Sequence, residues 1–78
     1  MERIYILAKV ETNTVENVVK ALSAIKGIKT LDVVTGPYDL MITLEGESVA
    51  RMLSTVVREI RSITGIISTE TLVGIKLD

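Results

Sequence analysis

The residues best suited to chemistry lie in one short turn, from Gly36 to Asp39, between two apolar runs of the sequence. Tyr38 contributes a phenol and Asp39 a carboxylate, while Gly36 can adopt backbone conformations that other residues resist. A free amino acid needs an acceptor for its ammonium group, and the Asp39 carboxylate can serve as one. Tyr38 can pack beside an apolar side chain of such a ligand. The turn therefore indicates a small-molecule binding site.

A second polar segment, Ser68-Thr69-Glu70-Thr71, follows much later in the chain. Its hydroxyls, together with that of Thr35, are donors that a ligand carboxylate needs. Both segments also have a purely structural interpretation. The turn can be a plain hairpin in which Asp39 caps the backbone, and threonine is common in strands because it packs well on a pleated sheet. The candidate ligand-binding residues are Thr35, Gly36, Tyr38, Asp39, Ser68, Thr69 and Thr71.

The composition argues against an enzyme and against a metal site. The 78 residues include no Cys and no His, which removes thiolate nucleophiles, the commonest general base and the commonest metal ligand. No second carboxylate is obviously paired with Asp39 for acid–base work. Gly36 and Gly46 are isolated, so the chain has no glycine-rich phosphate loop. We expect no enzymatic activity, no metal and no cofactor.

The charge pattern argues against nucleic acid and membrane partners. The formal net charge is −1 and no basic cluster occurs, so binding to duplex DNA is not expected. An RNA-recognition module would carry several aromatic residues on its strands, and only Tyr5 lies in the middle of one. No apolar run could span a bilayer, and the N-terminus lacks a signal-peptide pattern. The default interpretation is a soluble, cytoplasmic protein.

Hydrophobic periodicity predicts four strands and two helices. The strands cover residues 3–11, 28–35, 38–45 and 66–77, and the second helix covers about residues 47–62. The first helix starts at residues 12–14, where Asn13 and Glu16 fit a capping-box-like pattern, and Gly27 terminates it. The apolar stripe of the first helix is Val15, Val18, Val19, Leu22 and Ile25. The stripe of the second is Val49, Met52, Leu53, Val56, Val57 and Ile60.

The order β-α-β-β-α-β predicts a single α+β domain over residues 1–78 with the ferredoxin-like arrangement. Right-handed crossovers place both helices on one face of a four-stranded antiparallel sheet, with strand order 4-1-3-2. The first strand has an apolar middle on both of its faces, since Tyr5 and Leu7 alternate with a set of aliphatic residues. The open sheet face therefore predicts an interface with another subunit. A chain this small often gains stability by forming oligomers.

Two motifs connect the chain to a known family. Val33-Val34-Thr35-Gly36-Pro37-Tyr38-Asp39-Leu40 matches a T-G-x-Y-D turn, and Ser68-Thr69-Glu70-Thr71-Leu72 matches a late S-x-T segment. With the junction Ile25-Lys26-Gly27-Ile28, they make the whole chain resemble the effector-binding module of the Lrp/AsnC transcriptional regulators. The resemblance implies a ferredoxin-like fold, dimers that pack sheet to sheet, and rings of dimers. It also implies that a small effector, usually an amino acid, binds between dimers near the turn and the threonines.

Family members typically carry an N-terminal helix-turn-helix domain, whereas this chain begins directly at the first strand. The expected function is therefore an amino-acid-sensing and oligomerisation module in transcriptional regulation that acts without a DNA-binding domain of its own. One alternative is an interaction protein that joins or caps assemblies of full-length Lrp/AsnC regulators. Another is an ACT-like regulatory domain, which shares the strand order but explains the turn less well.

Overall fold

A computed structural model describes residues 1–77 of the chain. Its elements, in chain order, are β1 (Glu2–Val10), α1 (Val15–Ser23), β2 (Ile28–Val33), β3 (Leu40–Gly46), α2 (Val49–Thr55), the π-helical turn η1 (Val56–Ile60) and β4 (Ile66–Val73). The strands form one antiparallel sheet in the order β2-β3-β1-β4. The ferredoxin-like fold and the predicted strand order are therefore confirmed.

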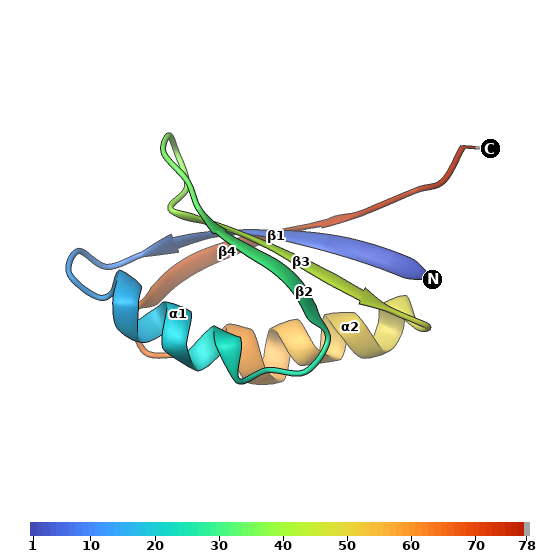
Figure 1. Cartoon of the computed structure of the whole chain (residues 1–78), viewed down its shortest axis with the longest axis horizontal. Coiled ribbons are helices and arrows are strands. Elements are labelled where there is room, and N and C mark those ends of the chain that lie inside the picture. Colours follow the sequence, from blue (N-terminus) through green and yellow to red (C-terminus); the bar gives the residue numbers. More distant parts are fainter. Residues whose placement is uncertain (78) are drawn as a thin grey trace.

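Both helices cover the same face of the sheet and leave the other face open (Figure 1). Residues of β1 alternate between the two faces, and every second one is fully or almost fully buried under the helices. The core on this helix face combines them with apolar residues of α1, β3, α2 and η1. Its members are Ile4, Ile6, Ala8, Val10, Val18, Leu22, Leu40, Ile42, Leu44, Met52, Val56 and Ile60.

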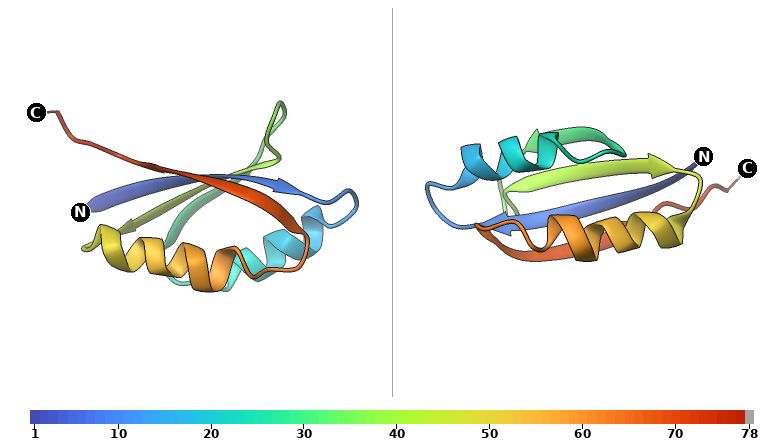
Figure 2. Two further views of the ribbon diagram at one scale, coloured as in Figure 1. Left: turned by 180° about the vertical axis from the view of Figure 1, so that it is seen from behind. Right: turned by 90° about the horizontal axis from the view of Figure 1, so that it is seen from below.

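The open face also has an apolar middle. Tyr5 and Leu7 point away from the helices and are only half-buried, while their neighbour Thr43 on β3 is almost fully buried. Two segments rise from the sheet on this side: the β2–β3 turn at one end and the C-terminal segment after β4 at the other (Figures 1 and 2). The open face is thus a shallow apolar surface between two projecting segments.

The first helix starts where predicted, with its N-cap within residues 12–14, but the predicted capping box is wrong. Asn13 lies before the helix with a φ of 70°, a left-handed conformation that Asn adopts more readily than most residues. Thr14 is the N-cap residue, and its hydroxyl donates to the Glu11 carbonyl at 2.6 Å instead of capping the helix. No capping box with Glu16 forms. The predicted end is also wrong: the helix ends at Ser23 with Ala24 as the C-cap residue, so Gly27, which has a φ of 97°, lies in the turn beyond the helix.

The second helix is shorter than predicted and changes type. It begins at Val49 after Ser48, whose side chain accepts a hydrogen bond from the Arg51 N–H at 3.2 Å. After Thr55 it continues as the π-helical turn η1 and ends at Ile60, short of the predicted residue 62. Leu53 and Val57 belong to the predicted apolar stripe of the second helix, but they are 37% and 59% exposed. The stripe of the second helix is therefore wider than its buried face.

The strand bounds also differ from the prediction. β1 starts and ends one residue earlier, β2 ends at Val33 rather than at residue 35, and β3 starts at Leu40 rather than at residue 38. β4 ends at Val73 rather than at residue 77. After Val73 one more backbone hydrogen bond connects the segment to β1, from the Gly74 N–H to the Arg3 carbonyl. Beyond this bond Ile75 and Leu77 are 80% and 95% exposed.

Candidate functional site

The turn between β2 and β3 is held by backbone hydrogen bonds at its base. The Val34 N–H donates to the Asp39 carbonyl at 2.9 Å, which closes the loop where the two strands separate. Gly36 has a φ of 112°, a conformation that residues with a Cβ rarely adopt, although a Cβ would meet no neighbouring atom there. Glycine at this position is thus required by backbone conformation and not by space. Thr35 and Gly36 are exposed on the rising part of the turn.

Asp39 connects this turn to β1. Its N–H donates to the Ala8 carbonyl, and its Oδ2 accepts a hydrogen bond from the Val10 N–H, each at 2.9 Å. The pairing of β1 with β4 shifts between Lys9 and Val10, where β4 has one extra residue. Asp39 directly precedes β3, and its carboxylate gives the Val10 N–H of β1 an acceptor at the point where β1 extends past the first residue of β3. Asp39 therefore does cap a backbone N–H group, and that group belongs to Val10 of β1 and not to the turn itself.

Tyr38 reaches from the turn across the sheet. Its hydroxyl donates to Oε1 of Glu70 on β4 at 2.5 Å, although β1 lies between β3 and β4. The Glu70 carboxylate stabilises the protonated phenol, so this hydrogen bond raises the pKa of Tyr38 above its ordinary value of 10.0. Sequence reasoning left Glu70 out of the site. The contact joins the turn to the polar segment of β4.

The polar segment of β4 divides between the two faces of the sheet. Thr69 and Thr71 lie opposite Ala8 and Ile6 of β1, so they share the face that the helices cover. Glu70 lies opposite Leu7 and shares the open face with Tyr38. Ser68 lies opposite Lys9, next to the shift in pairing. The seven predicted residues therefore do not form one cluster within a single chain.

The turn and the threonines nevertheless lie at the same end of the sheet, on the two sides of β1. Asp39 bonds to Ala8 on one side, and Thr69 is the strand partner of Ala8 on the other. Two strand spacings separate them, which is about 10 Å. β1 lies between the two groups, and Thr69 shares the face of the sheet that the helices cover.

On the helix side of the sheet, Thr69 and Thr71 line an open groove between β4 and the second helix. Leu53 and Val57 of the second helix and Arg61, the residue after it, also line this groove. The sequence predicted the two aliphatic residues as part of the apolar stripe of the second helix, and Arg61 was not among the predicted site residues. The wide apolar stripe of the second helix was the signal for this groove, because a stripe broader than the buried face must leave apolar residues exposed.

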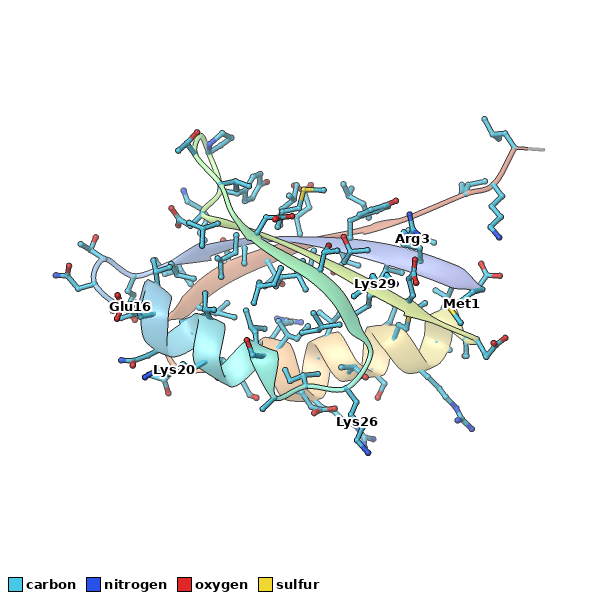
Figure 3. The ribbon with its side chains drawn as sticks, viewed as in Figure 1. Met1, Arg3, Glu16, Lys20, Lys26 and Lys29 are labelled. Atoms are coloured by element: carbon cyan, nitrogen blue, oxygen red, sulfur yellow. The ribbon has the colours of Figure 1, made fainter. Side chains whose placement is uncertain are left out.

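At the far end of the open face, Arg3 and Glu45 form an ion pair. Nε of Arg3 donates to Oε2 of Glu45 at 2.9 Å, and a second guanidinium nitrogen contacts the same oxygen. Figure 3 shows Arg3 on the side of the sheet away from the helices. The hydrogen bond from Arg3 lowers the pKa of Glu45 below its ordinary value of 4.5. This pair is remote from the turn.

Other kinds of site find little support in the described residues. Across residues 1–77, no three Cys, His, Asp or Glu side chains come together as potential metal ligands. Within the same range, no helix combines the length and apolar character needed to cross a bilayer.

Comparison with known proteins gives a consistent result. The family model described as the Lrp/AsnC ligand binding domain matches residues 3–76. The crystal structure of FFRP-DM1 is similar at a TM-score of 0.89 and 27% identity, covering 96% of this chain and 100% of that one. A crystal structure of a protein from Thermus thermophilus has a TM-score of 0.91 and 27% identity, covering 100% and 98% of the two chains.

A third similar structure is that of a transcriptional regulator from Neisseria meningitidis in complex with L-Met. Its TM-score is 0.86 at 12% identity, and the match covers 96% of this chain but 50% of that one, so this likeness concerns the fold alone. A comparison with curated protein sequences finds no match.

Proposed function

The chain belongs to the family of Lrp/AsnC ligand-binding domains, which are regulatory domains of transcription regulators, and we propose that it senses a small effector, an amino acid, and forms oligomers. The single observation that carries this proposal is the position of the turn and the threonines at the same end of the sheet. They flank β1 about 10 Å apart. The Asp39 carboxylate of the turn can accept hydrogen bonds from an ammonium group, and the threonine hydroxyls can donate to a carboxylate.

The ammonium of the amino acid would bind to the Asp39 carboxylate. One carboxylate oxygen accepts from the Val10 N–H, and a carboxylate has further lone pairs for a second donor. A charge-assisted hydrogen bond of this kind is shorter and stronger than a neutral one. The rigid base of the turn holds the carboxylate in place before any ligand arrives, so little conformational entropy would be lost on binding.

The carboxylate of the amino acid would bind to the hydroxyls of β4 in a neighbouring copy. The position of β1 between the two groups, with Thr69 on the face that the helices cover, supports a site shared between two copies. The Neisseria regulator, whose structure is titled as an L-Met complex, is a precedent for an amino acid on this fold. Its low identity transfers no residue roles.

Oligomer formation is the second part of the proposal. The half-buried Tyr5 and Leu7 give the open face an apolar middle. Both helices lie on the opposite face of the sheet, so no element of the described chain covers this one. A second copy packed sheet to sheet would cover it. The same surface equally favours a second candidate function, in which the chain only joins assemblies of larger Lrp/AsnC regulators and its effector site stays empty.

The decisive experiment is a thermal-shift screen against the standard amino acids, with Asp39→Asn as the test variant. Asn keeps an acceptor for the Val10 N–H but removes the charge, so the variant should fold while losing the response to amino acids. An amino acid at a hundred times its Kd should stabilise the wild type by about 2.7 kcal/mol, enough to raise Tm visibly. Asp32→Asn, which changes an exposed carboxylate on β2, is the matched control and should respond as the wild type does.

Three results of this screen separate the candidates. A shift in the wild type and in Asp32→Asn, but not in Asp39→Asn, would support amino-acid sensing through Asp39. Equal shifts in all three proteins would remove Asp39 from the site. No shift with any amino acid would favour the assembly function. Thr69→Val and Thr71→Val should also weaken the response, because each removes a hydroxyl and keeps a strand-forming residue.

A further inference from the structure

A pocket of about 300 Å³ lies at the end of the open face away from the β2–β3 turn. Tyr5 of β1 and residues 74–76, which follow β4, are among its lining residues. A Cβ at Gly74 would lie 3.1 Å from the carbonyl oxygen of Arg3 and 3.4 Å from Cε2 of Tyr5, so glycine lets the backbone lie this close to β1. Gly74 adds no side chain to the pocket, which therefore has room for a group from another molecule.

Exposed apolar side chains surround this pocket. Leu72, the strand partner of Tyr5 on β4, shares the open face with it and is 48% exposed. Ile75 and Leu77, in the segment after β4, are 80% and 95% exposed. Figures 1 and 2 show this segment rising from the open side of the sheet. A pocket bordered by projecting apolar side chains is suited to a protein partner.

Two opposite charges lie on either side of this apolar part of β4. Glu70 lies on the open face within the strand, and Lys76 lines the pocket. Val73 is the midpoint between them in the sequence. Two copies can meet face to face about a twofold axis at Val73, with their β4 strands in opposite directions. This arrangement brings each Glu70 onto Lys76 of the second copy and each Leu72 over Gly74 of the second copy.

We propose that the open face binds a second copy of the chain with the two β4 strands in opposite directions, so that Leu72 of each copy enters the pocket of the other and Lys76 pairs with Glu70. The inference rests on the oligomer formation proposed above and specifies its geometry. Glu70 can bind two donors, because one carboxylate oxygen accepts from the Tyr38 hydroxyl and the other has free lone pairs. Packed sheets lie about 10 Å apart, a distance that facing lysine and glutamate side chains can span together.

Charge disfavours the other way of packing two sheets about a twofold axis. With the axis along the strands, β4 of one copy lies over β2 of the other. Glu70 then comes near Asp32, since both belong to the row that crosses the sheet through Met41 and Leu7. Like charges that face each other across an interface suppress that arrangement. An exposed ion pair adds little affinity, so the charges select the orientation and the apolar contacts of Leu72 supply most of the affinity.

The charges of the central strands β1 and β3 favour neither orientation. At the pocket end, Arg3 is already paired with Glu45 within the chain. At the turn end, Asp39 bonds to the residues on either side of Lys9, so a cation and a carboxylate lie together there as well. Each end of the central strands is therefore close to neutral, and the charges of β4 decide between the two axes.

The first test measures the dimer Kd by sedimentation equilibrium for a charge-exchange series. Glu70→Lys and Lys76→Glu should each weaken the dimer by about tenfold, because both symmetric pairs become repulsive. The double variant exchanges the two charges and should recover the wild-type Kd, as a double-mutant cycle requires of a direct contact. Glu16→Lys, an equal charge change at an exposed position of α1, should leave the Kd unchanged. Tyr38→Phe, which removes only the bond to Glu70, should weaken the dimer less than Glu70→Lys does.

The second test locates the contacts by cross-linking, which is specific because the chain has no Cys. A mixture of Glu70→Cys and Lys76→Cys should form covalent dimers with a short bis-maleimide. Either variant alone should not, since its two sulfurs lie about 20 Å apart along the strands. Leu72→Ala should weaken the dimer by about tenfold, as expected of an anchor side chain in a pocket. Ile67→Ala is the matched truncation of an exposed aliphatic residue on the same strand and should have no effect.

The outcomes separate this geometry from oligomer formation as such. A wild-type dimer that Glu70→Lys leaves unchanged or tightens, or that the charge exchange does not restore, would overturn the geometry while oligomer formation stands. A mixture of the two cysteine variants that forms no covalent dimer would overturn it in the same way. A wild type that stays monomeric at every concentration would overturn both. Recovery of the Kd in the double variant, together with cross-linking in the mixture, would support the proposed arrangement.

Discussion

The carboxylate of Asp39 accepts a hydrogen bond from the backbone N–H of Val10 at 2.9 Å, across 29 positions of the sequence. The bond attaches the exposed β2–β3 turn to the end of the central strand β1, next to the irregularity at Lys9 and Val10. Asp39 therefore stabilises the fold even before any ligand is considered. A role in ligand binding must be separated experimentally from this structural role.

The first prediction concerns this bond. Asp39→Ala leaves the half-buried Val10 N–H without its acceptor and should lower the free energy of unfolding by about 1–3 kcal/mol. Asp39→Asn should cost less, because the amide oxygen can still accept. Urea denaturation monitored by circular dichroism measures both. Asp32→Ala, an exposed change on β2, should stay within about 0.5 kcal/mol, and an equally small effect of Asp39→Ala would show that the Asp39–Val10 bond contributes nothing.

The second prediction concerns Tyr38 and Glu70. In a Tyr5→Phe background Tyr38 is the only tyrosine of the chain, so its ionisation can be followed by ultraviolet absorbance. Glu70→Gln should lower the pKa of Tyr38 towards its ordinary value of 10.0, because it removes the carboxylate that stabilises the protonated phenol. The same pKa in both proteins would mean that the contact does not persist in solution.

The pH dependence of this contact has a definite sign. Folding raises the pKa of Tyr38, so its contribution to stability is complete below 10.0 and is lost as the pH rises through the higher folded-state value. The difference in Tm between the wild type and Tyr38→Phe should therefore shrink at strongly alkaline pH. A difference that grows with pH would contradict the assignment.

The third prediction concerns the ion pair of Arg3 and Glu45. Folding lowers the pKa of Glu45, chiefly through the hydrogen bond from Arg3, so the stabilisation is present above 4.5 and is lost as the pH falls through the lower folded-state value. Arg3→Gln should raise the pKa of Glu45, as measured by NMR titration of its carboxyl carbon. Lys29→Gln removes a weaker, purely coulombic contribution and should raise the pKa less.

The fourth prediction concerns the open face. Size-exclusion chromatography with light scattering should give a mass of at least twice 8.5 kDa at micromolar concentration. Leu7→Glu places a charge in the apolar middle of the open face and should yield a folded monomer, because burying an unpaired charge between two sheets is costly. Ala21→Glu, an exposed change on α1, should not alter the mass. A wild-type mass of 8.5 kDa would exclude the dimer.

The sequence by itself determined the types and order of the elements and the order of the strands. Alternating apolar residues in β1 and the helical spacing around Val18 and Leu22 are local signals, and they agree with the core that the structure shows. The β-α-β-β-α-β order then leaves few topologies, because crossover connections are right-handed. The two motifs that carried the family resemblance lie in the same chain segments that the family model matches.

The tertiary structure alone decided how the polar residues are grouped. Whether Thr69 faces the helices or the open side depends on its strand partner Ala8, and the shift in pairing at Lys9 and Val10 sets that register. The contact of Tyr38 with Glu70 requires the turn to rise above a strand that separates β3 from β4. The position of Arg61 at the groove depends on a π-helical turn that the apolar pattern does not encode. The physical reason is common to all three: periodicity records which face of an element is apolar, whereas register, bulges and helix type follow from hydrogen bonds and packing between residues far apart in the sequence.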